Sequence, residues 1–183
     1  ELCEGQIEEL QHTYSVARTV PSYLVSIEGK TASLFATSAR IGALVAGHDA
    51  TVVDALTNYG TSFGMVFQIV DDILDVIATD AELGKRAGHD MEEGVYTLPV
   101  LLTLAQQSSD TDELRSFLGK PLSQTERERA LVIVRTHSGI QSAIESAKNY
   151  VHMAEAECNL MPQGVATDAL QAAPAALLAS IIR

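Results

Sequence analysis

The sequence predicts an all-α protein, folded as an antiparallel bundle of helices. Apolar residues recur with helical spacing along most of the chain, and no segment shows a convincing strand-like alternation with a period of two. Helix-capping residues, glycines and prolines separate the apolar segments. With 183 residues, of which 46% are apolar, the chain is long enough to bury a sizeable core. We therefore expect residues 1–183 to form a single all-α domain.

The first helices are predicted from one break in the helical pattern. Residues 1–17 are typical of the end of a helix, whose apolar residues on one side are Leu2, Ile7, Leu10 and Tyr14. Pro21 marks a break and a first helical turn, so a long helix is predicted over residues 22–46. Because the chain opens in helical sequence without a cap, we expect it to be the C-terminal part of a longer protein.

The longest helix is predicted over residues 50–78. Gly47 is a suitable stop for the preceding helix, and Asp49 is a suitable N-cap for this one. Its second half is apolar except for a polar stripe at positions i, i+3, i+4 and i+7, which consists of Gln68, Asp71, Asp72 and Asp75. This spacing places the stripe on one face of the helix.

Shorter helices are predicted in the rest of the chain. Thr97 and Pro99 start one that runs to about residue 107. Two capping-box patterns start the next two helices: Asp110 with Glu113, and Ser123 with Glu126. Around a turn at Pro162-Gln163-Gly164, the remaining helices are expected at 111–118, 124–137, 140–158 and 166–182.

Residues 79–96 differ in character from the helices around them. They are rich in glycine and charge, lack helical periodicity, and include Gly84-Lys85 and Gly88-His89-Asp90. Long loops of this kind in a compact domain are commonly functional. One interpretation is a plain surface loop. The position directly after the acidic helix, together with the basic Lys85-Arg86, favours an active-site flap.

Composition and charge exclude several classes of function. A net charge of −12 argues against nucleic acid or an anionic membrane surface as the main partner. Cys3 and Cys158 lie far apart in sequence, without the spacing of a disulfide framework or a zinc site, which fits a reducing compartment such as the cytoplasm. No apolar run reaches membrane-spanning length, so no integral membrane segment is predicted, and no secretory signal is present.

The acidic stripe allows two interpretations. Ionised carboxylates are costly to bury without partners, and neighbouring ones repel each other. The stripe therefore either faces solvent at the edge of the bundle or faces a cavity in which divalent cations neutralise it. Oxygen ligands of this kind suit Mg²⁺, which binds through a few carboxylates together with substrate phosphates.

A second polar cluster follows Gly29 within the helix predicted over residues 22–46. Lys30 and Thr31 can be a lysine that extends to solvent and a threonine bonded to a backbone carbonyl one turn back. They can also be an ammonium that binds phosphate and a hydroxyl that faces a reacting centre. If the two long helices are antiparallel neighbours, Lys30 and Thr31 face Gln68 and Asp71 across the bundle.

The chain contains a set of motifs in a fixed order. They are Gly29-Lys30-Thr31, Phe67-Gln68 with Asp71-Asp72-x-x-Asp75, Gly84-Lys85 with Gly88-His89-Asp90, and Glu93-Gly94-x-x-Thr97-Leu98-Pro99. In this order and spacing the chain resembles the C-terminal half of the trans-isoprenyl diphosphate synthases, the polyprenyl synthetase family. The resemblance extends from about Leu2 to the end of the chain. It implies a bundle of the isoprenoid synthase type, here the C-terminal part of that bundle.

The resemblance also implies a reaction, the head-to-tail condensation of isopentenyl diphosphate with an allylic diphosphate. Mg²⁺ ions would bridge the allylic diphosphate to the acidic stripe, through Asp71, Asp72 and Asp75. Lys30 and Lys85 would bind the diphosphate, and Thr31 and Gln68 would lie near the allylic carbon, so that Lys30, Thr31 and Gln68 form the catalytic set. A homodimer is expected, because the family is commonly dimeric.

The chain departs from the family pattern, and other hypotheses remain open. No other Asp-Asp pair occurs in the sequence. We expect the first Asp-rich motif to precede Glu1 and this chain to be inactive alone. A non-catalytic subunit that packs against a complete synthase is one alternative. A class I terpene cyclase is another, although the Asn/Asp-x-x-Ser/Thr-x-x-x-Glu motif is not found in the corresponding region. A bundle with a merely solvated acidic face is the third.

Overall fold

In the described part of the chain, every element of regular secondary structure is a helix. The computed structural model describes residues 1–79 and 86–181, and no residue in these ranges lies in a strand. The elements are α1 (Leu2–Gln11), α2 (Val20–Ile27), the π-helical turn η1 (Glu28–Ala32), α3 (Ser33–Val45), α4 (Ala50–Ile77), α6 (His89–Glu92), α7 (Leu98–Leu104), α8 (Ser109–Phe117), α9 (Gln124–Thr136), α10 (Gly139–Cys158) and α11 (Val165–Ala179). The predicted all-α class is confirmed.

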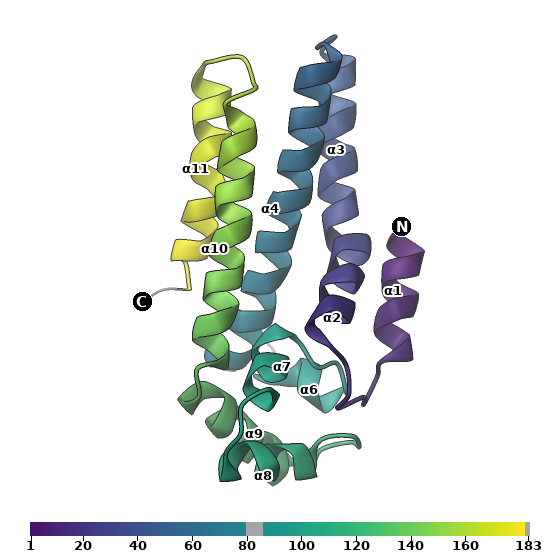
Figure 1. Cartoon of the computed structure of the whole chain (residues 1–183), viewed down its shortest axis with the longest axis vertical. Helices are drawn as coiled ribbons and strands as arrows, with labels where there is room; N and C mark the ends of the chain where they lie inside the picture. The colour runs from purple at the N-terminus through teal and green to yellow at the C-terminus, as the bar shows by residue number, and fades with distance from the viewer. Residues whose placement is uncertain (80–85, 182–183) are drawn as a thin grey trace.

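The long helix α4 lies at the centre of the bundle. It packs against α3 on one side and α10 on the other, and α11 packs against α10 (Figure 1). Successive long helices run in opposite directions, while α8 and α9 lie across one end of the bundle. The core side of α4 includes Met65, Val66, Ile69 and Ile73, each at most 1% exposed. Any polar side chain on this side of α4 is therefore removed from water, and its partners must come from the protein.

The helix predicted over residues 22–46 is present, but a π-helical turn interrupts it. Thr19 caps α2 by accepting a hydrogen bond from the backbone N–H of Ser22, and Pro21 lies in the first turn as expected. The wider turn η1 then contains Lys30 and Thr31. Such turns occur frequently at functional sites, because an extra residue changes the direction in which neighbouring side chains point.

Helix α1 lies against η1 at a point where two backbones nearly touch. A Cβ atom at Gly5 would lie 2.4 Å from the backbone nitrogen of Lys30, so only glycine permits this approach. The resulting orientation turns Leu2, Ile7 and Leu10 to solvent, with exposed fractions of 42%, 53% and 63%. Tyr14 does not share their side, since α1 ends at Gln11. The prediction of one helix through residue 17 is therefore too long.

Most of the predicted helix boundaries agree with the structure. Asp49 caps α4 by accepting from the backbone N–H of Val52 at 3.1 Å, and Gly47 ends α3 at a positive φ of 76°. The capping box at Ser123 is also confirmed. The box predicted at Asp110 is wrong: the reciprocal bonds instead join Ser108 and Thr111, so α8 begins at Ser109. Helix α7 ends at Leu104, earlier than predicted.

The two cysteines are not joined by a disulfide bond, and they lie in different surroundings. Cys3 is exposed, Cys158 is buried, and both are free thiols. None of the helices in residues 1–79 and 86–181 is long and apolar enough to cross a bilayer.

Candidate functional site

A continuous chain of hydrogen bonds joins α2, η1 and α4. The Thr31 hydroxyl donates to the Gln68 carbonyl oxygen Oε1 at 2.7 Å, and Gln68 Nε2 donates to Asp72 Oδ1 at 2.8 Å. From the other side, the Tyr23 hydroxyl donates to Asp72 Oδ2 at 2.5 Å. The sequence predicts that Lys30 and Thr31 face Gln68 and Asp71 across two neighbouring helices; the structure bears this out for Thr31 and Gln68, whereas Lys30 pairs with Glu9. We call this set Tyr23, Asp72, Gln68 and Thr31 the polar relay.

Asp72 sets the direction of the polar relay. The Gln68 amide donates from its NH₂ group to Asp72, so it presents its carbonyl oxygen to Thr31. The Thr31 hydroxyl must then donate to Gln68, which leaves its oxygen lone pairs directed away from this bond. The direction of the Thr31–Gln68 hydrogen bond therefore follows from the hydrogen bond that the Gln68 amide donates to Asp72.

Burial makes the negative charge of Asp72 expensive. The side chain is only 3% exposed, and burial raises the pKa of Asp72 from 3.8 to about 8, against the hydrogen bonds from Tyr23 and Gln68, which lower it. Asp90 and Asp71 raise this pKa further through charge repulsion. The same environment raises the pKa of the fully buried Tyr23 well above 10.0, first through desolvation and then through the charge of Asp72. A nearby cation would stabilise the ionised carboxylate.

The other aspartates of the stripe have different surroundings. Asp71 is exposed and makes no hydrogen bond or ion pair with the described residues. Asp75 is 3% exposed; its Oδ2 accepts from the backbone N–H of Asp90 at 3.3 Å, and its backbone carbonyl accepts from the Gly88 N–H at 2.7 Å. The segment after α4 is thereby fixed to the acidic end of the helix.

The predicted metal ligands do not form a ready-made site. Within residues 1–79 and 86–181, no group of three or more Asp, Glu, His or Cys side chains is arranged to hold a metal ion. Asp71 fits a ligand to Mg²⁺, because its carboxylate is exposed and uncommitted. Asp72 fits poorly, since both its oxygens accept hydrogen bonds inside the core. Remaining ligands would have to come from substrate phosphates, water or other carboxylates.

Lys30 lies next to the polar relay but points to a partner on α1. Its ammonium is 2.8 Å from Glu9 Oε1, with exposed side-chain fractions of 36% for Lys30 and 11% for Glu9. Its charge is accessible, as phosphate binding requires. Glu9 was not among the predicted site residues.

The predicted flap is only partly within the described residues. Lys85 lies outside them, so its predicted diphosphate contact stays a prediction. The expectation of an irregular loop over 79–96 is wrong for His89–Glu92, which form the helical turn α6. Met91 on this turn is 1% exposed and packs into the core. The described part of the segment is thus anchored to the bundle.

Besides Glu9, two further residues of this region were missed by the sequence analysis, Tyr23 and Arg18. Both lie near Pro21 and are buried, with exposed fractions of 1% and 6%. Tyr23 occupies a helical position that an apolar residue could equally fill, so spacing alone does not distinguish it. An arginine directly before a helix start is usually exposed, and only the fold reveals its burial.

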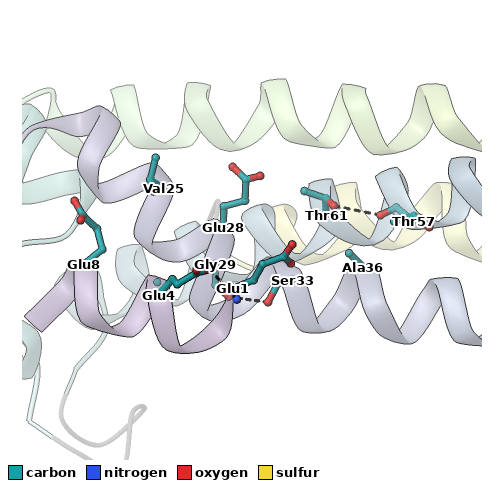
Figure 2. A pocket seen from close by; sticks show the side chains of 11 residues that line it. Glu1, Glu4, Glu8, Val25, Glu28, Gly29, Ser33, Ala36, Thr57 and Thr61 are labelled. Carbon is teal, nitrogen blue, oxygen red and sulfur yellow. Dashed lines mark hydrogen bonds and ion pairs between the residues drawn. The ribbon is translucent and has the colours of Figure 1, made fainter.

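A separate cavity of about 670 Å³ lies between α1, η1, α3 and α4 (Figure 2). Its lining includes Glu4, Glu8 and Glu28 but neither Thr31 nor Gln68. The Thr61 hydroxyl in its wall donates to the backbone carbonyl of Thr57, so it is already used within α4. The carboxylates make this cavity unsuitable for a bare diphosphate.

Comparison with known proteins places the chain in a family. The family model described as polyprenyl synthetase matches residues 1–134. A geranylgeranyl diphosphate synthase from Saccharolobus solfataricus is 39% identical over 155 residues, which cover 84% of this chain and 46% of that protein. The chain therefore belongs to the polyprenyl synthetase family.

Other relatives agree in sequence and in structure. The heptaprenyl diphosphate synthase component 2 of Bacillus subtilis is 33% identical over 172 residues, covering 94% of this chain and 49% of that protein. The crystal structure of a polyprenyl synthase from Caulobacter crescentus, complexed with calcium and isoprenyl diphosphate, aligns with a TM-score of 0.90 at 30% identity. That alignment covers 97% of this chain and 55% of the crystallised chain. The chain thus spans about half the length of the curated relatives it matches.

Proposed function

We propose that the chain is the C-terminal half of a trans-prenyltransferase, which condenses isopentenyl diphosphate head-to-tail with an allylic diphosphate. The observation that carries this proposal is the Thr31–Gln68 contact beside the acidic end of α4, in a member of the polyprenyl synthetase family. Because the chain spans about half the length of its relatives, we assign turnover to a protein that also contains the other half of the family fold. We expect the 183-residue chain to be inactive alone.

The first chemical requirement is the loss of diphosphate from the allylic substrate. Divalent metal ions, when bound, neutralise the charge of the leaving diphosphate. We assign Asp71 as the ligand that α4 presents directly, with Asp75 beside it. For Asp72 we now propose orientation of Gln68 in place of direct metal binding, because its oxygens already accept two hydrogen bonds. Lys30 adds positive charge at the diphosphate, and Lys85 is proposed to do the same.

The second requirement is stabilisation of the positive charge that develops on the allylic carbon. The Thr31 hydroxyl donates a hydrogen bond to Gln68, so the lone pairs of its oxygen can face that charge. The rings of Phe35 and Phe67 have centroids 5.3 Å apart, Phe67 directly precedes Gln68 in the chain, and it is 43% exposed. Aromatic faces there would contact the prenyl group and exclude water that would otherwise react with the cation.

A non-catalytic subunit is the second candidate, because a relative carries the name of a synthase component. In that case the chain would support a complete synthase without turnover at Thr31. A class I terpene cyclase is less well supported, and it would not consume isopentenyl diphosphate. Consumption of this substrate separates both alternatives from the proposed prenyltransferase.

We also propose a homodimer in the cytoplasm. The exposed apolar side chains Leu2, Ile7 and Leu10 support an interface on α1, for a second copy of the chain or for the other half of the family fold. Sedimentation equilibrium would test it, since a dimer of the chain has twice the mass of 19.6 kDa. A monomer at all concentrations would contradict this part of the proposal.

The substitution Thr31→Val tests the proposed role of a single hydroxyl group in the reaction. The substitution removes the hydroxyl and retains the branched shape, so turnover should fall by about tenfold to a hundredfold while the fold is kept. Thr37→Val is a matched control on the next helix, because the exposed Thr37 hydroxyl only donates to the Ser33 carbonyl. The assay is Mg²⁺-dependent consumption of labelled isopentenyl diphosphate with an allylic primer. Equal rates for both variants would contradict the role of Thr31.

A further inference from the structure

Arg18 is a buried cation in the turn before α2. Its Nη2 donates to the Ser26 hydroxyl oxygen at 2.5 Å, and its Nη1 donates to the Tyr96 carbonyl at 3.2 Å. The guanidinium carbon lies 5.5 Å from the centroid of the Tyr23 ring. The side chain is 6% exposed, and Nε has no hydrogen-bond partner. Arg18 thus connects the turn, α2 and the segment before α7.

This arrangement is costly. Within the described residues, no carboxylate lies within ion-pair distance of Arg18, and desolvation lowers the pKa of its guanidinium. A buried charge without a direct counter-ion is unfavourable, and a hydrophobic side chain of similar length would often serve stability better. The planar guanidinium, however, can stack on an aromatic ring and donate in fixed directions at the same time. The geometry therefore indicates a role other than stability.

The Tyr23 ring lies between Arg18 and the polar relay. Its face is near the guanidinium, and its hydroxyl donates to Asp72 Oδ2. Desolvation lowers the pKa of Arg18, and among the charges that raise it Glu9 comes first, with Asp72 a smaller contribution. The cation and the carboxylate are thus on opposite ends of one tyrosine, and both are removed from water.

We propose that Arg18 is a positioning residue for the Thr31–Gln68 pair. It holds the Tyr23 ring in place through the contact of its guanidinium with the ring face, so that the Tyr23 hydroxyl stays directed at Asp72. Asp72 then accepts from Gln68 Nε2, and the Gln68 carbonyl faces Thr31. The inference rests on the proposed function for the role of this pair in turnover, whereas the positioning itself is a property of the chain. Arg18 contacts the Tyr96 carbonyl, the Ser26 hydroxyl and the Tyr23 ring, and it makes no hydrogen bond to Thr31 or Gln68.

The kinetic test uses Arg18→Met and Arg18→Lys in the complete enzyme. Methionine keeps much of the length but removes the charge and the donors, so kcat per folded molecule should fall by about tenfold. The KM values for both diphosphates should stay within about twofold, because the diphosphate ligands are unchanged. Lysine retains the charge without the planar donors, so its kcat should lie between those of Arg18→Met and the unmodified enzyme.

The second test needs no turnover. In the ¹⁵N–¹H spectrum of the 183-residue chain, the side-chain NH₂ signals of Gln68 report its hydrogen bond to Asp72. We expect these signals to shift in Arg18→Met and in Tyr23→Phe. Tyr59→Phe is the matched control, because Tyr59 is also buried and its hydroxyl donates to the distant Leu170 carbonyl.

The outcomes of these tests separate the positioning role of Arg18 from the proposed prenyltransferase function. Unchanged Gln68 signals in Tyr23→Phe, or an unchanged kcat in Arg18→Met, would overturn the positioning role. If Arg18→Met does not fold, Tyr23→Phe carries the spectroscopic test, since it removes only one hydroxyl. If the unmodified enzyme consumes no isopentenyl diphosphate, the proposed function fails, and the Gln68 signals still decide the positioning. Shifted Gln68 signals, together with a kcat that is lower in Arg18→Met and partly restored in Arg18→Lys, would support the positioning role.

Discussion

Replacing the aspartates of α4 one at a time should reveal how differently they are held. Asp72→Ala removes the acceptor of two hydrogen bonds, from Tyr23 at 2.5 Å and from Gln68 at 2.8 Å. A buried donor left without an acceptor costs about 1–3 kcal/mol, and Gln68 is only partly buried. Relief of the buried carboxyl group offsets part of this cost. We therefore expect Asp72→Ala to lower the free energy of unfolding by about 1–3 kcal/mol.

Asp71→Ala is the matched control, one residue earlier on the same helix. Because Asp71 is exposed and makes no bond with the described residues, its removal should change the free energy of unfolding by no more than about 0.5 kcal/mol. Urea denaturation of the chain, followed by far-ultraviolet circular dichroism, measures both values at one fixed pH. Equal losses for the two variants would refute the claim that Asp72 is committed to the core and Asp71 is available for binding.

Further predictions concern pH, packing and charge. The pKa of Asp72 is raised from 3.8 to about 8, so between these pH values the folded state keeps a proton that the unfolded state releases. The free energy of unfolding should therefore fall as pH rises through this range. Denaturation experiments on Asp72→Asn should show no such fall. Gly5→Ala places a Cβ 2.4 Å from the backbone nitrogen of Lys30 and should destabilise the chain by about 1–3 kcal/mol. Gly42→Ala is the control and should not destabilise it, because a Cβ there has no neighbouring atom within 4 Å. Thermal melts compare the two variants. Glu9→Gln removes the partner of the Lys30 ammonium and should lower the KM for the allylic diphosphate by about two- to fivefold in steady-state assays.

The helical pattern of the sequence was sufficient for the architecture. Apolar spacing and caps such as Asp49 located the long helices, and antiparallel packing then brought Thr31 next to Gln68. The spacing of the acidic stripe placed its residues on one face. It could not reveal that Asp72 and Asp75 point into the core while Asp71 is exposed, because this depends on which neighbours cover the helix.

Other parts of the site depend on tertiary contacts that have no local signal. The π-helical turn at Glu28–Ala32 is not encoded by an obvious residue, and its close contact with Gly5 is known only once α1 is placed. The polar relay also contains Tyr23, which reads as an ordinary core residue in the sequence. The same holds for the capping box at Ser108, where a nearby Asp-x-x-Glu pattern suggested a different start.

The central claim is that the acidic end of α4 promotes the loss of diphosphate, and one measurement tests it most directly. Consumption of labelled isopentenyl diphosphate with an allylic primer and Mg²⁺ should be measured for the complete enzyme and for two variants. Asp71→Ala should reduce turnover at least about a hundredfold. Asp54→Ala, at an exposed aspartate of the same helix that pairs with Arg40, should leave it unchanged. Near-normal turnover in Asp71→Ala, or no consumption by the unmodified enzyme, would contradict the account.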